Sequence, residues 1–460
     1  MHKNKTIANF DCNDFYIKNI QIYDKTLMPF PVTSNPQQFN RDYTEWRKSR
    51  CIPCSTQNFV YSQPYAQGSA YSDISNSVQA SINDCYWLKS EALSKLQWED
   101  INYYKNKMSD KAKFVELSDD NFVKYENVND KLQKYFLSNP KRPKNIKYFT
   151  LNQDNNYCLI KSDNVLNNGK DVYNEIIGNV LCDVLEIPHA DYYIVPYNIN
   201  YNNEILTIPL IGCELCIQDE NLECITIDAA IRSGIVSKQE VYGDFIQRGF
   251  GDFVNKMITL DYLMLNSERD YTNFGYIRNS DTLEIVDVMP IYDCASSFNK
   301  ENTMPNLDLC MPFRDRHNEQ IKMVSDFSWL DINELYETIP EIEAILSYSP
   351  MSEQEQQDII NLLLPRIHDL ECYITNNSFN TKNPYEISEF RILENIKRRF
   401  CIDKIKEYSG FDPTKDYRLD KIYFSFLTEE GKKDFNEFEV SNPNVRERFE
   451  HFKKNTFGIE

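Results

Sequence analysis

The sequence predicts an α+β fold with two lobes, a small lobe rich in strands and a larger helical lobe. Short apolar runs at 157–161 and 206–217 have the length and the polar flanks that are typical of strands. Between them, apolar residues over 172–185 recur every four positions and predict a helix. Farther along the chain, apolar residues at 260–265 and 359–370 follow the same helical spacing.

The 460 residues are enough for two or three domains. We expect an N-terminal region at 1–115, which begins as a hairpin or an irregular arm, and a small lobe at 116–215. The helical lobe would follow at 216–375. A polar run at 376–384 precedes a change in charge balance, which predicts a separate helical appendage at 376–460.

The charge of the chain argues against a general nucleic-acid groove. The formal net charge is −20, and it lies entirely before residue 378, because residues 378–460 carry 16 basic and 16 acidic side chains. So acidic a surface repels phosphate backbones. We therefore expect no direct contact with nucleic acid and a protein substrate or a regulatory protein as the partner. The sequence leaves the oligomeric state open.

The sequence carries no signal for a membrane or for export. No apolar run approaches the roughly 18 residues of a membrane span, and residues 1–10 lack a signal-peptide apolar region. We therefore expect no membrane contact and a cytoplasmic protein. The 13 cysteines, an odd number scattered through strand and helix patterns, fit reduced thiols in that compartment.

Three polar side chains have a spacing that is typical of phosphoryl transfer. Glu268 lies five residues before Asn273, and Asp293 follows twenty residues later. Transfer of phosphate from ATP needs a carboxylate to orient the attacking hydroxyl, together with an amide oxygen and a second carboxylate to hold magnesium. The interval of five is that of the protein-kinase catalytic loop. Ordinary loop residues are the alternative, but an apolar helical stretch at 260–265 and one or two buried strands predicted at 283–291 flank both would-be ligands and favour the kinase-like site.

A kinase also needs a cation for the α and β phosphates and an acid that positions this cation. Lys161 ends the first apolar strand, and Glu175 lies within the helical stripe that follows. An acid beside a buried stripe needs a partner, and Lys161 would supply one. A solvated lysine and an exposed glutamate are the more common situation for any single pair. The order of the elements favours the pair, because strand lysine, helix glutamate, hinge, catalytic loop and metal aspartate follow one another as a kinase fold requires.

The predicted strand at 206–217 runs into a connector that would hold adenine through backbone groups. Side chains are weakly specified there, so Glu214 and Cys216 are assigned to nucleotide binding by position alone. Cys213 and Cys216 form one of two C-x-x-C pairs, and Cys51 and Cys54 form the other. Two such pairs can build a zinc site. The pairs lie about 160 residues apart, however, and zinc is disfavoured.

Two motifs resemble the HipA-like serine/threonine kinases, especially those of low-GC Gram-positive bacteria. The catalytic pattern of that family is N-x-D-R-H-x-x-N-F-G followed by P-I-F-D-x-G-x-S. This chain reads N-S-E-R-D-Y-T-N-F-G at 266–275 and P-I-Y-D-C-A-S-S at 290–297. Further matches lie at 41–53 and 311–321, and the resemblance covers roughly residues 40–372. It implies a two-lobed protein-kinase-like fold that uses ATP and magnesium and acts on a protein serine or threonine.

The resemblance also implies a role for each site residue. Lys161 would bind the ATP phosphates, with Glu175 as its partner. Asn273 and Asp293 would hold magnesium. The catalytic triplet would be Glu268, Arg269 and Asp270, with Glu268 at the position of the catalytic carboxylate.

Three departures from the family pattern leave a second reading open, a pseudokinase that binds nucleotide or a partner protein without turnover. The catalytic aspartate is Glu268 here, and a reach that is longer by one methylene can cost roughly a hundredfold in rate. The family histidine is Asp270, which adds negative charge and is itself an alternative base. The segment expected to cover the phosphates, at 126–134, contains no glycine, although backbone N–H groups approach phosphates most closely where Cβ is absent.

Overall fold

The computed structural model describes about three fifths of the chain. The described residues are 1–13, 16–29, 32, 36–48, 80–106, 116–117, 146–162, 169–201, 204–298, 310, 312–314, 316–376 and 379. The predicted phosphate-covering segment at 126–134 and nearly all of the predicted appendage at 376–460 lie outside the described residues.

The chain divides into two compact units, each built from several separate segments. The first unit comprises Met1–Lys161, Glu214–Gly251 and Tyr271–Pro290. The second comprises Ser162–Cys213, Asp252–Asp270 and Ile291–Glu460. The predicted domain boundaries refer to continuous segments, and they remain a prediction.

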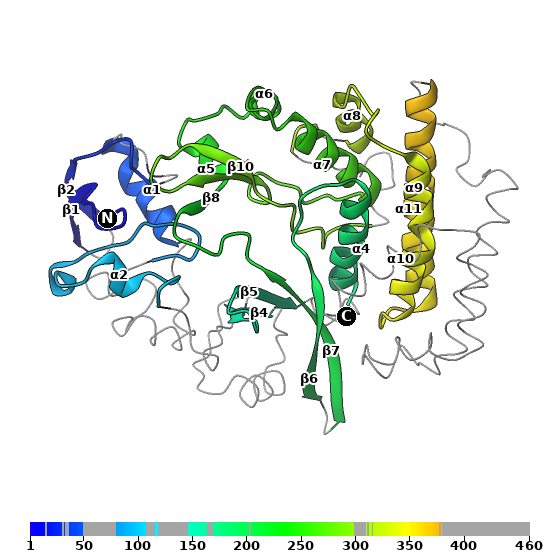
Figure 1. The fold of residues 1–460 in the computed structure, drawn as a ribbon, viewed down its shortest axis with the longest axis horizontal. Helices are drawn as coiled ribbons and strands as arrows, with labels where there is room; N and C mark the ends of the chain where they lie inside the picture. Colours follow the sequence, from blue (N-terminus) through cyan, green and yellow to red (C-terminus); the bar gives the residue numbers. More distant parts are fainter. Residues whose placement is uncertain are drawn as a thin grey trace, which may run out of the picture. The chain divides into compact units, whose positions relative to one another are not determined.

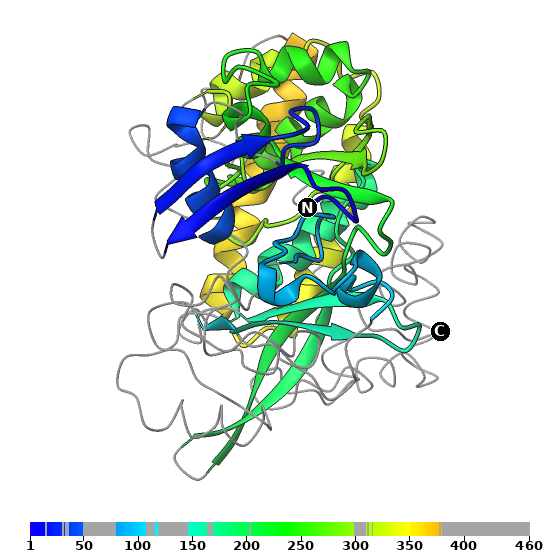
Figure 2. The same ribbon diagram turned by 90° about the vertical axis from the view of Figure 1, so that its left-hand side faces the viewer.

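The first unit contains three sets of antiparallel strands and four helices among the residues described. Strands β1 (Ala8–Asn13) and β2 (Tyr16–Ile22) form the N-terminal hairpin, which is prominent in Figure 2. Strand β4 (Ile146–Leu151) pairs with β3 (Glu116–Leu117) and with β5 (Tyr157–Ser162). The helices are α1 (Pro36–Lys48), α2 (Trp98–Ile101), α5 (Ile227–Arg232) and α6 (Val241–Gln247), besides a short 3-10 turn at Glu91–Leu93.

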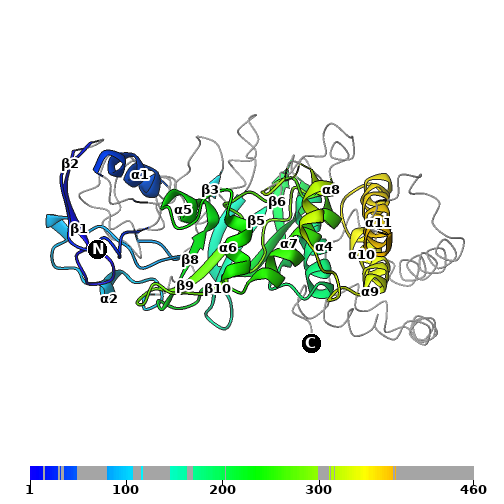
Figure 3. The same ribbon diagram turned by 90° about the horizontal axis from the view of Figure 1, so that it is seen from above.

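The third set is a sheet in the order β10-β9-β8, visible in Figure 3. It consists of β8 (Leu222–Thr226), β9 (Gly275–Asn279) and β10 (Ile285–Val288). A Cβ at position 275 would lie 2.0 Å from the carbonyl oxygen of Ile225, so only glycine allows β9 to approach β8 this closely. The last residue of the N-F-G motif therefore fixes the start of β9, two residues after Asn273.

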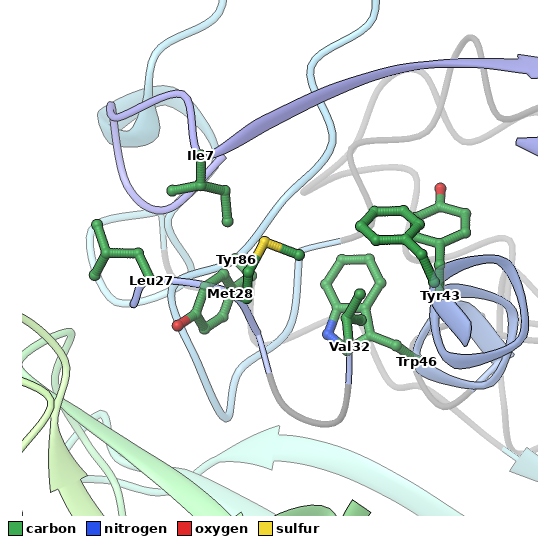
Figure 4. Packing of buried hydrophobic residues seen from close by; sticks show 8 residues of the cluster. Ile7, Leu27, Met28, Val32, Tyr43, Trp46 and Tyr86 are labelled. Carbon is green, nitrogen blue, oxygen red and sulfur yellow. The ribbon is translucent and has the colours of Figure 1, made fainter. Parts of the chain in front are cut away.

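An aromatic and aliphatic cluster anchors the N-terminal hairpin to α1 (Figure 4). The side chains of Phe39 and Tyr43 on α1 stack nearly parallel, and Phe10 of β1 meets both rings edge-on. Burial of apolar side chains of this size stabilises the fold by about 1.5–3 kcal/mol each. The predicted hairpin at the N-terminus is therefore a packed part of the first unit. The buried members are Ile7, Leu27, Met28, Val32, Phe39, Tyr43, Trp46 and Tyr86.

We predict that the stability of this region depends on pH, because it buries the imidazole of His2. The side chain is 5% exposed, its ring lies against Tyr86, and its Nε2 has no hydrogen-bond partner among the described residues. Burial, with smaller effects of Lys3 and Arg278, lowers the pKa of His2 from 6.5 to about 4. Because the unfolded chain takes up a proton below pH 6.5 and the folded one only near pH 4, stability is complete above pH 6.5 and falls toward pH 4.

We expect this linkage to reach about 3 kcal/mol at most, and His2→Phe should remove it while keeping the ring contact. Urea unfolding of both chains between pH 4 and 7.5, followed by tryptophan fluorescence, measures the difference in stability. Equal pH profiles of the two chains would show that His2 is not the titrating group.

The second unit is mostly helical. Its described helices are α4 (Lys170–Val184), α7 (Gly251–Met264), α8 (His317–Gln320), α9 (Ile332–Glu337), α10 (Ile339–Ser347) and α11 (Glu353–Asn376), and a 3-10 turn at Ile321–Met323 follows α8. Helices α9, α10 and α11 lie side by side in Figures 1 and 3. Strands β6 (Tyr193–Tyr201) and β7 (Glu204–Glu214) form a long antiparallel hairpin (Figure 1).

The predicted class, α+β, is confirmed, and the elements follow one another as the sequence predicts. Lys161 is the penultimate residue of β5, Glu175 lies in α4, and α7 ends one residue before Leu265. The apolar stripe of α11 is buried over most of its length. None of the described helices combines the length and the apolar character that crossing a membrane requires.

One predicted element differs from the structure. We expected buried strand structure over 283–291, but β10 comprises only Ile285–Val288, and Val286 is 50% exposed. Leu283 has a φ of 63°, a left-handed conformation that interrupts extended backbone before the strand begins. Because β10 belongs to an antiparallel sheet, which is commonly packed on one face only, part of the strand stays open to solvent.

Candidate functional site

The turn after α7 begins the predicted catalytic motif, and two residues, Leu265 and Asn266, determine its conformation. Leu265 has a φ of 52° and is buried, so the chain leaves the helix sharply at this point. The side chain of Asn266 donates to Asp261 Oδ1 at 3.0 Å and accepts the Glu268 N–H at 3.1 Å. His317 of α8 contacts the Asn266 carbonyl through Nε2 at 3.1 Å. Asn266, the first residue of the N-S-E-R-D motif, thus stabilises the turn through these contacts with α7, Glu268 and α8.

A fully buried ion pair lies beneath this turn. Arg269 Nε is 3.2 Å from each carboxylate oxygen of Asp261, and both side chains are inaccessible to solvent. Burial raises the pKa of the Asp261 carboxyl, against the opposing effect of Arg269. Burial also disfavours the charged guanidinium, but Asp261 outweighs it and holds the pKa of Arg269 well above its ordinary value. Arg269 therefore stays a cation within the interior.

The same arginine fixes the segment that carries Asp293. Arg269 donates to the Tyr292 carbonyl and to Cys294 Sγ, the latter at 3.2 Å. Between these two contacts, Asp293 has a φ of 62°. A non-glycine residue in this region is uncommon, and such conformations persist where the surrounding structure enforces them, often at functional sites. The contacts of Arg269 with the two neighbours of Asp293 therefore fix the position of this half-buried residue.

Helix α4 supports the segment from its other side. Glu175 is 1% exposed and accepts the Cys294 N–H at 2.7 Å. Asn174 donates to the carbonyls of Ala295 and Ser297, at 2.8 and 3.0 Å. Cys294 fits against Gly178, where an added Cβ would lie 3.2 Å from the Cys294 Cβ. The predicted helix glutamate and the predicted metal aspartate are thus linked through one backbone amide.

Glu268 lies at the surface of the second unit, with its carboxylate directed at a serine. Its Oε2 accepts a hydrogen bond from Ser296 Oγ at 2.5 Å. Ser267 adds two longer contacts to the Ser296 carbonyl, at 3.3 and 3.4 Å. Asp270, whose N–H donates to the Glu268 carbonyl at 2.7 Å, is half-buried. The catalytic triplet and the segment after Asp293 therefore contact each other directly.

The other predicted site residues belong to the first unit. Lys161 is half-buried at the end of β5, and Asn273 accepts the Thr272 hydroxyl at 3.3 Å just before β9. Glu214 is exposed and accepts hydrogen bonds from Asn152 and Asn156. Cys216 lies 3.4 Å from another thiol, that of Cys224.

The structure thus brings together five of the predicted residues in the second unit: Glu175, Glu268, Arg269, Asp270 and Asp293. Their roles remain predictions. Sequence reasoning gave no role to two residues of this cluster, Asp261 and Asn266. The signal for Asp261 was an acid on an otherwise apolar stretch of α7, which requires a buried partner.

The donors present fit magnesium held mainly through phosphates. Magnesium in kinase and ATPase sites takes one or two protein carboxylates and completes its octahedron with phosphate and water oxygens. Asp293 offers one half-exposed carboxylate in a rigid setting. No group of three or more His, Cys, Asp or Glu side chains suited to a metal occurs among the described residues. An all-protein cage is therefore not found in that part of the chain, and Cys51 and Cys54 of the zinc site considered above lie outside the described residues.

Comparison with known proteins finds matches among solved structures. No protein-family model matches the chain, and no curated protein does. Solved structures that match include a proinflammatory kinase of Helicobacter pylori, CtkA, with 16% sequence identity and a TM-score of 0.32. The match covers 50% of this chain and 92% of the kinase. The function therefore has to be inferred from the residues of the site.

Proposed function

We propose that the protein is a HipA-like kinase that transfers phosphate from ATP, with magnesium, to a serine or threonine of a protein. The observation that carries this proposal is the hydrogen bond of 2.5 Å from Ser296 Oγ to Glu268 Oε2. Glu268 occupies the position of the catalytic carboxylate in the motif, and the acceptor of a serine/threonine kinase is a hydroxyl of this kind. Despite its extra methylene, Glu268 can thus orient a serine hydroxyl.

Each residue then has a defined role. Glu268 would orient the acceptor hydroxyl and take its proton as the oxygen attacks phosphorus. Asp293 and Asn273 would hold magnesium, which when bound neutralises charge on the phosphates. Lys161 would bind phosphate oxygens, with Glu175 as its partner. Arg269 acts as a positioning residue, because from a fully buried location it holds the Tyr292 carbonyl before Asp293 and the Cys294 side chain after it.

The alternative is a pseudokinase that binds nucleotide or a partner protein without turnover. The same contact supports it, because an internal serine that remains on Glu268 excludes a foreign hydroxyl. The partner in either case would be a protein. The net charge of −20 favours one with a basic surface.

Incubation with γ-labelled ATP and magnesium, with and without a panel of serine and threonine peptides, tests the proposal. We expect Glu268→Gln to lower the rate of label transfer by roughly 10² to 10⁴, the usual contribution of a general base, while nucleotide binding is retained. Ser296→Ala serves as the matched control, because it frees Glu268 without removing the carboxylate. Its transfer to peptide should equal or exceed that of the native chain.

The outcomes separate the two readings. Nucleotide binding without transfer in both the native chain and Ser296→Ala would establish the pseudokinase. Full activity in Glu268→Gln would move the role of base to Asp270 or exclude a base. Mass spectrometry of the product distinguishes the addition of phosphate from that of AMP.

A further inference from the structure

Two thiols of the first unit, Cys216 and Cys224, lie side by side on neighbouring stretches of chain. Cys216 follows the last residue of β7 by two positions, and Cys224 is the third residue of β8. Their Sγ atoms are 3.4 Å apart. A disulfide brings two sulfurs to about 2.05 Å, so a shift of little more than one ångström separates this contact from a covalent bond.

Hydrogen bonds hold the connector between the two thiols. The side chain of Gln218 accepts the Tyr157 N–H at 2.9 Å and donates to the carbonyls of Tyr157 and Leu215, at 3.0 and 2.8 Å. At the other end, the Cys224 N–H donates to the Asn83 carbonyl at 3.1 Å. The two sulfurs are therefore oriented toward each other before any reaction, which raises their effective concentration.

The two thiols differ in exposure and acidity, as an attacking and a resolving thiol should. Cys216 is exposed, and the hydrogen bond from Cys224 lowers its pKa against the opposing effect of burial. The pKa of Cys224 is raised well above its ordinary value, by its bond to Cys216 and by burial. For comparison, burial raises the pKa of the Cys85 and Cys294 thiols to about 12, which makes them unreactive.

We propose that Cys216 and Cys224 form a redox pair, which a hydroperoxide closes to an intrachain disulfide. In the first step the Cys216 thiolate attacks one peroxide oxygen, the O–O bond breaks, and hydroxide leaves as Cys216 becomes a sulfenic acid. In the second step the Cys224 thiol attacks that sulfur and gives up its proton, the S–O bond breaks, and the departing hydroxide takes this proton and leaves as water. Two thiols and one hydrogen peroxide thus yield one disulfide and two waters, and the thiols supply both electrons.

The disulfide would cross-link the segment that immediately follows β7 to strand β8. This is the segment assigned by sequence to nucleotide binding, yet the proposed chemistry requires only the two thiols and a peroxide. Its test is therefore independent of kinase activity.

The experiment treats the reduced full-length chain with hydrogen peroxide, blocks the remaining thiols by alkylation, and digests the denatured product with a glutamate-specific protease. Cleavage after Glu214, Glu220 and Glu223 separates all three nearby cysteines, because Cys213 precedes the first site, Cys216 lies between the first two, and Cys224 follows the third. We expect a cross-link between the peptide 215–220 and the peptide that begins at residue 224. Dithiothreitol should reverse it.

Two variants test the order of the steps. Cys224→Ser should abolish the cross-link and leave a sulfenic acid on Cys216 that a dimedone probe traps. Cys216→Ser should abolish both products. Cys372→Ser is the matched control, because Cys372 is a partly exposed thiol elsewhere in the chain, and the cross-link should form at the native rate.

Two results would overturn the proposal. One is a cross-link from Cys216 to Cys213 or to another chain in place of Cys224. The other is overoxidation of Cys216 in the native protein without any cross-linked peptide. Both can be read from the native chain alone, so the conclusion does not depend on the folding of a variant.

Discussion

Replacing Asp293 with asparagine should abolish the magnesium-dependent binding of ATP and with it any phosphate transfer. At a free nucleotide concentration of 100 times Kd, binding to the native state alone contributes about 2.7 kcal/mol, which corresponds to a rise in Tm of roughly 5 to 10 °C for a unit of this size. Asp293→Asn should lose this rise, because an amide lacks the charge that holds magnesium. Differential scanning fluorimetry with ATP and magnesium measures it, and Asp293→Ala should behave in the same way.

At position 293, asparagine is a more specific test than alanine. Asp293 has a φ of 62°, and asparagine adopts this left-handed conformation almost as readily as aspartate does, whereas alanine adds backbone strain. Asp287→Asn, which removes one exposed carboxylate from β10, is the matched control and should keep the full rise in Tm. If Asp293→Asn keeps that rise too, Asp293 does not hold the metal.

Breaking the buried ion pair should produce the largest loss of stability. Arg269→Met leaves the Asp261 carboxylate buried without its cation, and Asp261→Leu leaves the guanidinium without its anion. Removal of one partner from a buried pair costs about 3–5 kcal/mol. Urea unfolding of each variant measures this loss, provided that the transition remains cooperative.

A double variant and a surface pair test this explanation. The double change Arg269→Met with Asp261→Leu should cost clearly less than the sum of the two single changes, because neither charge then remains buried. Some loss should persist, because the Tyr292 carbonyl loses its donor. Arg232→Met breaks a pair with Asp228 that is half exposed, and its effect should not exceed about 0.5 kcal/mol. Additive losses at 261 and 269 would contradict a coupled pair.

Arg269 also connects stability to function. Because its guanidinium holds the Tyr292 carbonyl before Asp293 and the Cys294 thiol after it, Arg269→Lys should weaken nucleotide binding even where the chain remains folded. Lysine keeps the charge, but it lacks the planar guanidinium whose separate N–H groups reach Asp261, Tyr292 and Cys294 at the same time. We therefore propose a positioning role for Arg269, the middle residue of the predicted catalytic triplet.

The local elements of this protein could be predicted from sequence because their signals are local. The helix that carries Glu175 follows from apolar residues at every fourth position, and the strand that carries Lys161 follows from a short apolar run between polar residues. The interval between Glu268 and Asn273 likewise needs only a count along the chain. The strand at 283–291 was predicted too long, because a left-handed residue at Leu283 is invisible to hydrophobic pattern.

What the sequence determined by itself is the class of fold, the order of its elements and the motif that suggests phosphoryl transfer. Only the tertiary structure decided which side chains meet: Arg269 with Asp261, Ser296 with Glu268, and Cys216 with Cys224 in place of its C-x-x-C neighbour. The physical reason is that periodicity reports which face of an element is buried. Pairing between polar groups depends instead on backbone turns, such as those at Leu265 and Asp293, that fold distant residues onto one another.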